Sequence, residues 1–171
     1  MAIQLILCLE TNKKADTDGI YIMETIRNRY ILDNKTKISR VYMTTKSKYK
    51  SKDVLKDIKD KRDQYSKVGE SVVIYCIDTD DYEKNYDHKK EWDEINDYCI
   101  ENGFELIWFC HDVEEVYWGE RVSDSEKKDR AIKFKAKKMI NNIDLKKLFC
   151  DKKKSCFSNI ITVLDKYLKK K

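Results

Sequence analysis

Short apolar runs alternate along the chain with longer amphipathic segments. Residues 3–9 (IQLILCL), 71–77 (SVVIYCI) and 104–110 (FELIWFC) are runs of mostly apolar residues. Runs of this length predict strands that are buried on both faces of a sheet. Residues 38–44 (ISRVYMT) alternate weakly between apolar and polar positions, which predicts a further strand, the second along the chain.

The segments between these strands have the spacing of amphipathic helices. The predicted helices are residues 20–31 with a cap at Asp16, Thr17 or Asp18, 51–65 with a start at Ser51 or Asp53, and 91–102 with Gly103 as a left-handed C-cap. Two more helices, over about 124–141 and 155–168, follow the last strand. The last of them has a continuous apolar stripe from Phe157 to Leu168, which must pack against another part of the protein.

Four strands that alternate with three helices indicate an α/β fold. We expect a four-stranded, mainly parallel sheet of the Rossmann-like kind, with right-handed crossovers and helices on both faces. Residues 1–120 then form the α/β core. Residues 121–171 form a basic helical C-terminal extension that packs on this core.

Charge is distributed unevenly along the chain. Residues 1–119 contain 19 Lys and Arg and 24 Asp and Glu, a net charge of −5, whereas residues 120–171 contain 17 and 7, a net charge of +10. A basic segment attracts polyanions such as nucleic acid. Lysine-rich helices that are simply solvated would give the same pattern.

Two features of the sequence bear on the compartment. No stretch approaches 18 uninterrupted apolar residues, and the start lacks the basic lead of a signal peptide, so we expect a cytoplasmic protein without a membrane span. Its six cysteines are then expected to be reduced. A zinc site from Cys99, Cys110, His111 and one more ligand is conceivable, although the spacing fits no established pattern.

Acidic residues follow three of the four predicted strands. Glu10 ends the first strand, and Asp78 and Asp80 come just after the third. The residues just past the fourth strand include Asp112, Glu114 and Glu115. Ligands of open parallel sheets bind at the carboxyl ends of the strands, and Mg²⁺ prefers oxygen ligands. In an extended DTD segment the two aspartates would point to the same side and Thr79 away from them. The pattern therefore predicts a magnesium site.

Other interpretations of these acids stay open. Loops are polar and Asp is a common turn residue, so the acids could be solvated. A haloacid-dehalogenase-type phosphatase would need its DxD after the first strand, where this chain has Glu10-Thr11-Asn12. A receiver-type phosphoacceptor fits in part, but the first strand offers one Glu where a pair of acids is expected.

Three stretches together resemble the TOPRIM domain, the metal-binding module of topoisomerases, primases and several nuclease families. They are LILCLETNKKADTDGIYI, VVIYCIDTDD and NGFELIWFCHDVEEVYW, within residues 1–120. The similarity is greatest to the small RloB-like and abortive-infection TOPRIM proteins of phage-defence loci. This chain departs from the family pattern in two places. Thr11 replaces the glycine that usually follows the TOPRIM glutamate, and the family's TE-x-x-YF-like segment survives only as TDGIYI, which a longer loop displaces along the chain.

The resemblance implies roles for individual residues. Glu10 would be the TOPRIM glutamate, a metal ligand or general base, and Asp78 and Asp80 would be the magnesium-binding aspartates. Glu114, or equally Glu115, would be the acidic residue that these proteins have in the turn after the later strand, before an aromatic-rich helix. A second ion would then be held by Asp81 or Glu114, and Mg²⁺ or Mn²⁺ would be the cofactor.

Basic and aromatic side chains near the predicted site are candidates for binding nucleic acid. The candidates are Lys13 and Lys14 near Glu10, and Lys46, Lys48 and Lys50 after the second strand. His111 could act as a general acid or base, or simply bond a backbone carbonyl. Tyr117 and Trp118 could stack on bases, although their apolar context favours the core.

Two functions of different classes follow from these features. The first is magnesium-dependent, nuclease-like hydrolysis of phosphodiesters in RNA or DNA, with phage defence as its setting. The alternative is a non-catalytic binding or assembly module that acts with a protein partner, either a partner ATPase or another copy of the chain.

Overall fold

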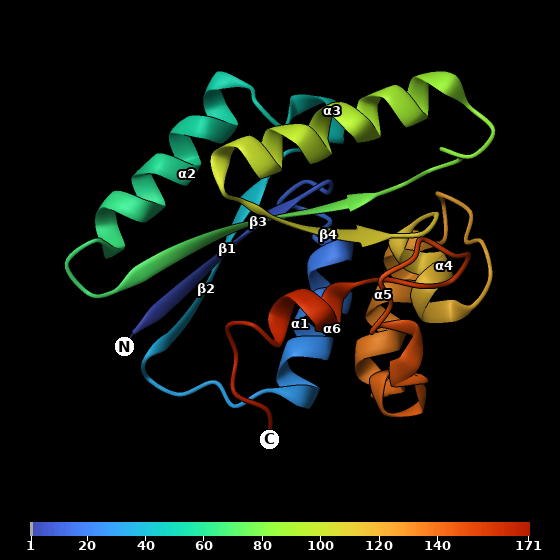
Figure 1. The fold of residues 1–171 in the computed structure, drawn as a ribbon. Coiled ribbons are helices and arrows are strands. Elements are labelled where there is room, and N and C mark those ends of the chain that lie inside the picture. The colour runs from blue at the N-terminus through green and yellow to red at the C-terminus, as the bar shows by residue number, and fades with distance from the viewer. Residues whose placement is uncertain (1) are drawn as a thin grey trace.

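Four parallel strands form one sheet at the centre of the molecule (Figure 1). The computed structural model describes residues 2–171. The strands are β1 (Ile3–Leu9), β2 (Thr36–Tyr42), β3 (Glu70–Asp78) and β4 (Glu105–Phe109). Their order is β2-β1-β3-β4, and every neighbouring pair is parallel. The predicted α/β class and parallel sheet are therefore confirmed.

The strand order places the chain's first strand beside its third. β1 pairs with β2 on one side and with β3 on the other, and Leu9 lies opposite Cys76. The chain thus reverses its direction across the sheet between β1 and β3, and this switch point is where open α/β sheets bind ligands. As a result, Glu10 and Asp78 emerge next to each other at the carboxyl edge of the sheet.

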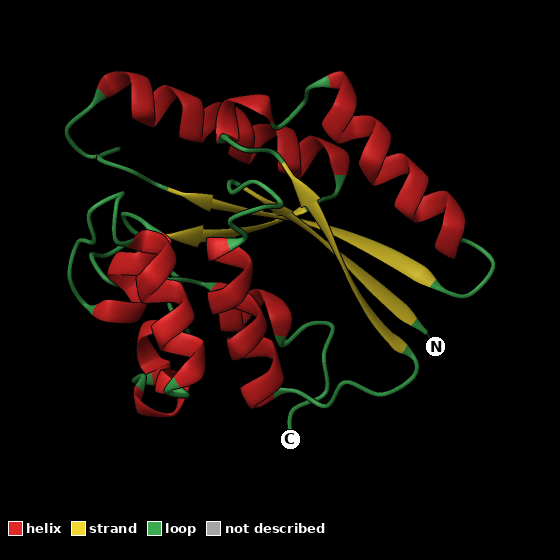
Figure 2. Cartoon of the chain, turned by 180° about the vertical axis from the view of Figure 1, so that it is seen from behind, coloured by secondary structure: helices red, strands yellow, loops and turns green. Residues whose placement is uncertain are grey.

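Helices cover both faces of the sheet (Figure 2). They are α1 (Thr17–Arg29), α2 (Lys52–Tyr65), α3 (Tyr86–Asn102), α4 (Val113–Trp118), α5 (Lys127–Ala136) and α6 (Ile160–Leu164). Alternate residues of a strand point to opposite faces. Leu5 and Leu7 of β1 accordingly pack in the core shared with α1, α4, α5 and α6, whereas Ile6 and Cys8 pack beneath α2 and α3.

Local capping explains several helix ends. Ser51 accepts a hydrogen bond from the backbone of Val54 at the start of α2, and Gly103 ends α3 in the left-handed conformation, both as expected. α3 begins at Tyr86 rather than near residue 91, because Asn85 caps it through its side chain. Residues 113–118, which lie outside the predicted helices, form the short helix α4.

The C-terminal extension is less helical than expected. The predicted helix over 124–141 is helical as α5 only from Lys127 to Ala136, with a short 3₁₀ turn after it, and the predicted helix over 155–168 is reduced to α6. The reason is the free edge of β4, where Ser158 forms an antiparallel bridge with Phe109. Ser158 pairs with this strand edge, and the helix begins only after it, at Ile160.

The extension belongs to the same core as the rest of the chain. Phe134 of α5 packs against Tyr21, with ring centroids 4.9 Å apart, and against Tyr117 at 5.4 Å. Tyr117 also stacks on Tyr21, which supports a core role rather than base stacking. Among residues 2–171, no helix is both long enough and apolar enough to cross a membrane.

Candidate metal centre at the carboxyl edge of the sheet

Glu10 and Asp78 are joined at the switch point of the sheet. The Glu10 carboxylate accepts a hydrogen bond of 2.7 Å from the backbone N–H of Asp78. Asp78 Oδ1 in turn accepts one of 3.0 Å from the backbone of Val113, at the start of α4. These bonds fix both carboxylates beside a cavity of about 340 Å³ that they line together with Asp18 and Asp80.

Asp80 reaches this cavity by a different geometry from the one expected. Its φ is 49°, so the DTD segment is not extended throughout. The backbone N–H of Asp80 bonds to the carbonyl of His111 at 2.9 Å, which holds the turn in place. Thr79 is fully buried, and Asp78 and Asp80 line one cavity although the segment is not extended throughout. Asp tolerates the left-handed conformation better than most residues do.

Asp18 is the ligand candidate that the sequence did not reveal. It lies in the first turn of α1, where it was interpreted only as a capping residue, and its carboxylate accepts a hydrogen bond of 3.2 Å from Thr17. The turn between Glu10 and α1 brings it back to the cavity. Thr11 has no positive φ, so the turn needs no glycine at that position.

Lys46 is a buried cation beside these acids. Its ammonium forms an ion pair with Asp80, donates a hydrogen bond of 3.0 Å to the carbonyl of Asp78, and lies 3.9 Å from Glu91. Only 6% of its side chain is exposed. Lys46 therefore belongs to the site itself. The other lysines predicted to contact nucleic acid are exposed on the surface: Lys13, Lys14, Lys48 and Lys50.

Burial and mutual repulsion disfavour the charged forms of Glu10, Asp18 and Asp78. Burial raises the pKa of Glu10 to about 8, against the opposing effect of Lys46. It also raises the pKa of Asp78 well above its usual range, and the neighbouring Glu10 adds to the effect. Asp18 has its pKa raised to about 6, again chiefly by burial. A cation in the cavity would reverse this penalty, because it favours ionised carboxylates.

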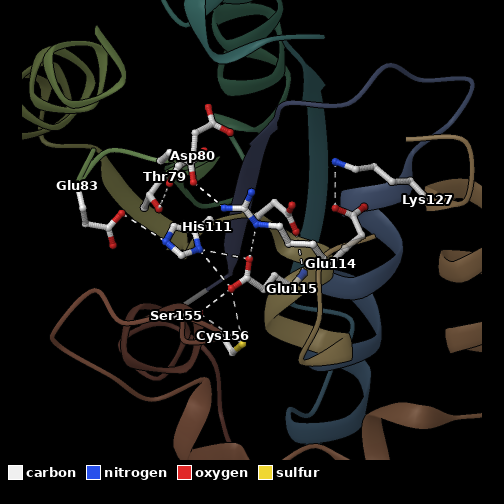
Figure 3. Close-up of polar contacts among 12 residues, drawn as sticks. Thr79, Asp80, Glu83, His111, Glu114, Glu115, Lys127, Ser155 and Cys156 are labelled. Atoms are coloured by element: carbon white, nitrogen blue, oxygen red, sulfur yellow. Dashed lines mark hydrogen bonds and ion pairs between the residues drawn. The ribbon is translucent and has the colours of Figure 1, made fainter. Parts of the chain in front are cut away.

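Glu114 lies behind the cavity instead of lining it. Its side chain is 1% exposed, and neither oxygen has a hydrogen-bond partner. Lys127 of α5 forms an ion pair with Glu114 (Figure 3). The distance from Nζ to the carboxylate is 3.4 Å, and Lys127 also lines the cavity. Burial raises the pKa of Glu114 to about 7 despite this lysine.

Asp81 and His111 face a second cavity. Asp81 binds Arg121 at 2.6 Å, and it lines a cavity of about 250 Å³ together with His111 and Asp112. The structure thus brings together Glu10, Asp78 and Asp80, and it places the two candidates for a second ion, Asp81 and Glu114, outside their cavity.

No family model, curated protein or solved structure matched the chain. The site is therefore assigned from its own geometry. That geometry is a group of four carboxylates at the switch point of a parallel sheet, and Lys46 and Lys127 are the cations next to it. Carboxylate oxygens are the ligands that hard divalent cations prefer, but no three of these four carboxylates place one oxygen each within 4.8 Å of one another, so an ion bound here would need water molecules or a shift of the side chains to complete its coordination.

The raised pKa values predict how stability depends on pH. Between pH 5 and 8 the folded state keeps protons on Glu10, Asp18 and Glu114 that the unfolded state releases, so stability falls as pH rises through this window. One pKa unit corresponds to about 1.4 kcal/mol, so we expect a loss of at least about 2 kcal/mol, or roughly 4–8 °C in Tm. Thermal melts of the metal-free protein will measure it. Glu10→Gln should flatten the profile, and a Tm that rises from pH 5 to 8 would contradict the prediction.

Proposed function

We propose that this protein is a nuclease that hydrolyses phosphodiester bonds in RNA or DNA with Mg²⁺ or Mn²⁺. The observation that carries the proposal is the convergence of Glu10, Asp78 and Asp80 on one cavity. The resemblance of the same three residues to the acidic positions of TOPRIM domains supports it. A setting in phage defence belongs to the proposal through that resemblance alone.

The residues around the cavity fit a hard divalent cation. Glu10, Asp78 and Asp80 would hold it, with Asp18 as a further oxygen donor, and no nitrogen or sulfur ligand lines that cavity among the residues the structure describes, apart from the cationic amine of Lys127. A bound ion would polarise a phosphodiester and lower the pKa of a water molecule. The chain itself orients Glu10 through the Asp78 N–H and holds Asp80 through Lys46.

Positive charge near the cavity supports a polyanionic substrate. Lys127 lines the cavity, and Lys13 and Lys14 are exposed in the loop that follows Glu10. Residues 120–171, which supply Lys127, have a net charge of +10. Such charges neutralise phosphates and release counterions when nucleic acid binds.

A non-catalytic binding module, acting with a partner ATPase or another copy of the chain, is the second candidate. Lys46 is the observation that favours it, because its buried ammonium already neutralises Asp80 without any metal. The two candidates differ in whether the cavity takes up a divalent ion.

Thermal melts with divalent metal will distinguish the two candidates. At about 100 times its dissociation constant, an ion that binds only the folded state adds about 2.7 kcal/mol, or roughly 5–11 °C in Tm for a chain of this size. We expect Mg²⁺ and Mn²⁺ at millimolar concentrations to produce such a shift at pH 8. Glu10→Gln should lose most of it, whereas Glu94→Gln, an exposed control on α3, should keep it. A wild-type Tm that is indifferent to both metals would leave only the binding module.

A further inference from the structure

Three side chains of a different chemical kind meet at the ends of β3 and β4. Glu83, Cys110 and His111 each offer one ligand atom, and these atoms all lie within 4.8 Å of one another. His111 Nε2 is 3.3 Å from the Glu83 carboxylate. Cys110 and His111 directly follow β4, and Glu83 comes from the loop between β3 and α3. Cys99, the other cysteine considered for a zinc site, is not a member of this group.

The imidazole of His111 is already held in an orientation suited to a metal ligand. Its Nδ1 lies 3.2 Å from both oxygens of Glu115, and Nε2 is turned toward Glu83 (Figure 3). Metal-binding histidines commonly bond a carboxylate through their second nitrogen in this way. Glu115 is itself fixed, because it accepts a hydrogen bond of 2.6 Å from Ser155 and lies 3.6 Å from Arg121 Nε.

A second histidine lies close to this group. His88 lines the same cavity of about 250 Å³ as His111. Glu83 and Cys110 do not line that cavity, so His88 is not placed among the ligands.

We propose that Glu83, Cys110 and His111 form a zinc site, separate from the carboxylate cavity around Glu10. The set of one oxygen, one nitrogen and one sulfur suits a borderline-soft ion such as Zn²⁺ and does not suit Mg²⁺. Three protein ligands leave a fourth position open to water or to a ligand in the cavity. The ion would tie the loop after β3 to the end of β4.

Cobalt provides a direct test, because Co²⁺ replaces Zn²⁺ and a thiolate bound to it absorbs in the near ultraviolet by charge transfer. The full-length protein is stripped with a chelator and titrated with Co²⁺. We expect a charge-transfer band that saturates at one equivalent, disappears on adding Zn²⁺ and persists in excess Mg²⁺. Absence of the band in the wild-type protein would overturn the proposal.

Three variants locate the ligands. Cys110→Ser should remove the band, whereas Cys150→Ser, which changes a cysteine outside the group, should keep it. Because Cys110 is buried, a second variant avoids any loss of folding: the Glu83 side chain is 41% exposed, and Glu83→Gln should weaken Co²⁺ binding at least tenfold. An unchanged band in Cys110→Ser, or unchanged affinity in Glu83→Gln, would overturn the assignment. Asp78→Asn should leave the band intact, which separates this site from the proposed nuclease centre.

Discussion

Asp78→Asn is expected to abolish metal-dependent cleavage of nucleic acid. Asp78 lies at the switch point with Glu10, and its Oδ1 is fixed by the backbone of Val113. Asn keeps that hydrogen bond and the side-chain shape, so the fold should persist while the negative charge that holds the ion is lost. Metal-ion stabilisation of a phosphodiester transition state contributes several kcal/mol, so we expect a loss of at least about 1,000-fold in kcat/KM.

Cleavage of labelled single-stranded RNA and DNA at pH 8 with Mn²⁺ will measure this loss. Asp60→Asn is the matched control, because Asp60 is an exposed aspartate on α2. The same variant should also raise the Tm of the metal-free protein, since it removes a charge that burial and Glu10 disfavour. If Asp78→Asn keeps wild-type activity, Asp78 has no catalytic role, and the proposed nuclease site around Asp78 is wrong.

Lys46→Met is expected to cause the largest loss of stability among the variants proposed. The ammonium of Lys46 is buried and bonds both Asp80 and the carbonyl of Asp78. Removing one member of a buried ion pair costs about 3–5 kcal/mol, whereas exposed pairs are worth under about 1 kcal/mol. Because 44% of the Asp80 side chain is exposed, we expect an intermediate loss of about 2–3 kcal/mol.

Urea unfolding of the metal-free protein will measure this loss. Lys48→Met, an exposed lysine two residues away, should change stability by no more than about 0.5 kcal/mol. Adding Asp80→Asn to Lys46→Met should recover part of the loss, because it removes the carboxylate left without its cation. Equal stabilities for the two single lysine variants would show that the Lys46 ion pair is not important for folding.

The sequence predicted the sheet and the meeting of Glu10 with Asp78 because both depend on short-range patterns. Apolar runs set the strands, and the runs of β1 and β3 lead directly into Glu10 and Asp78. Parallel strands then bring their carboxyl ends to one edge, so no knowledge of side-chain packing was needed.

The rest of the site depends on side chains that fold back across long distances. Lys46 reaches Asp80 from a 3₁₀ turn after β2, and among several nearby lysines nothing in the sequence marks it as the buried one. Asp18 looked like a helix cap, since Asp is common at both kinds of position. Asp80 adopts a left-handed backbone that a strand pattern does not indicate.

The bridge between Ser158 and Phe109 has a consequence for synthesis of the chain on the ribosome. β4 cannot acquire this neighbour until the ribosome has added Ser158, well after β4 itself has been made. A product terminated before that residue would display an open strand edge of the kind that recruits other chains into aggregates. Copies that end before Ser158 are therefore expected to aggregate.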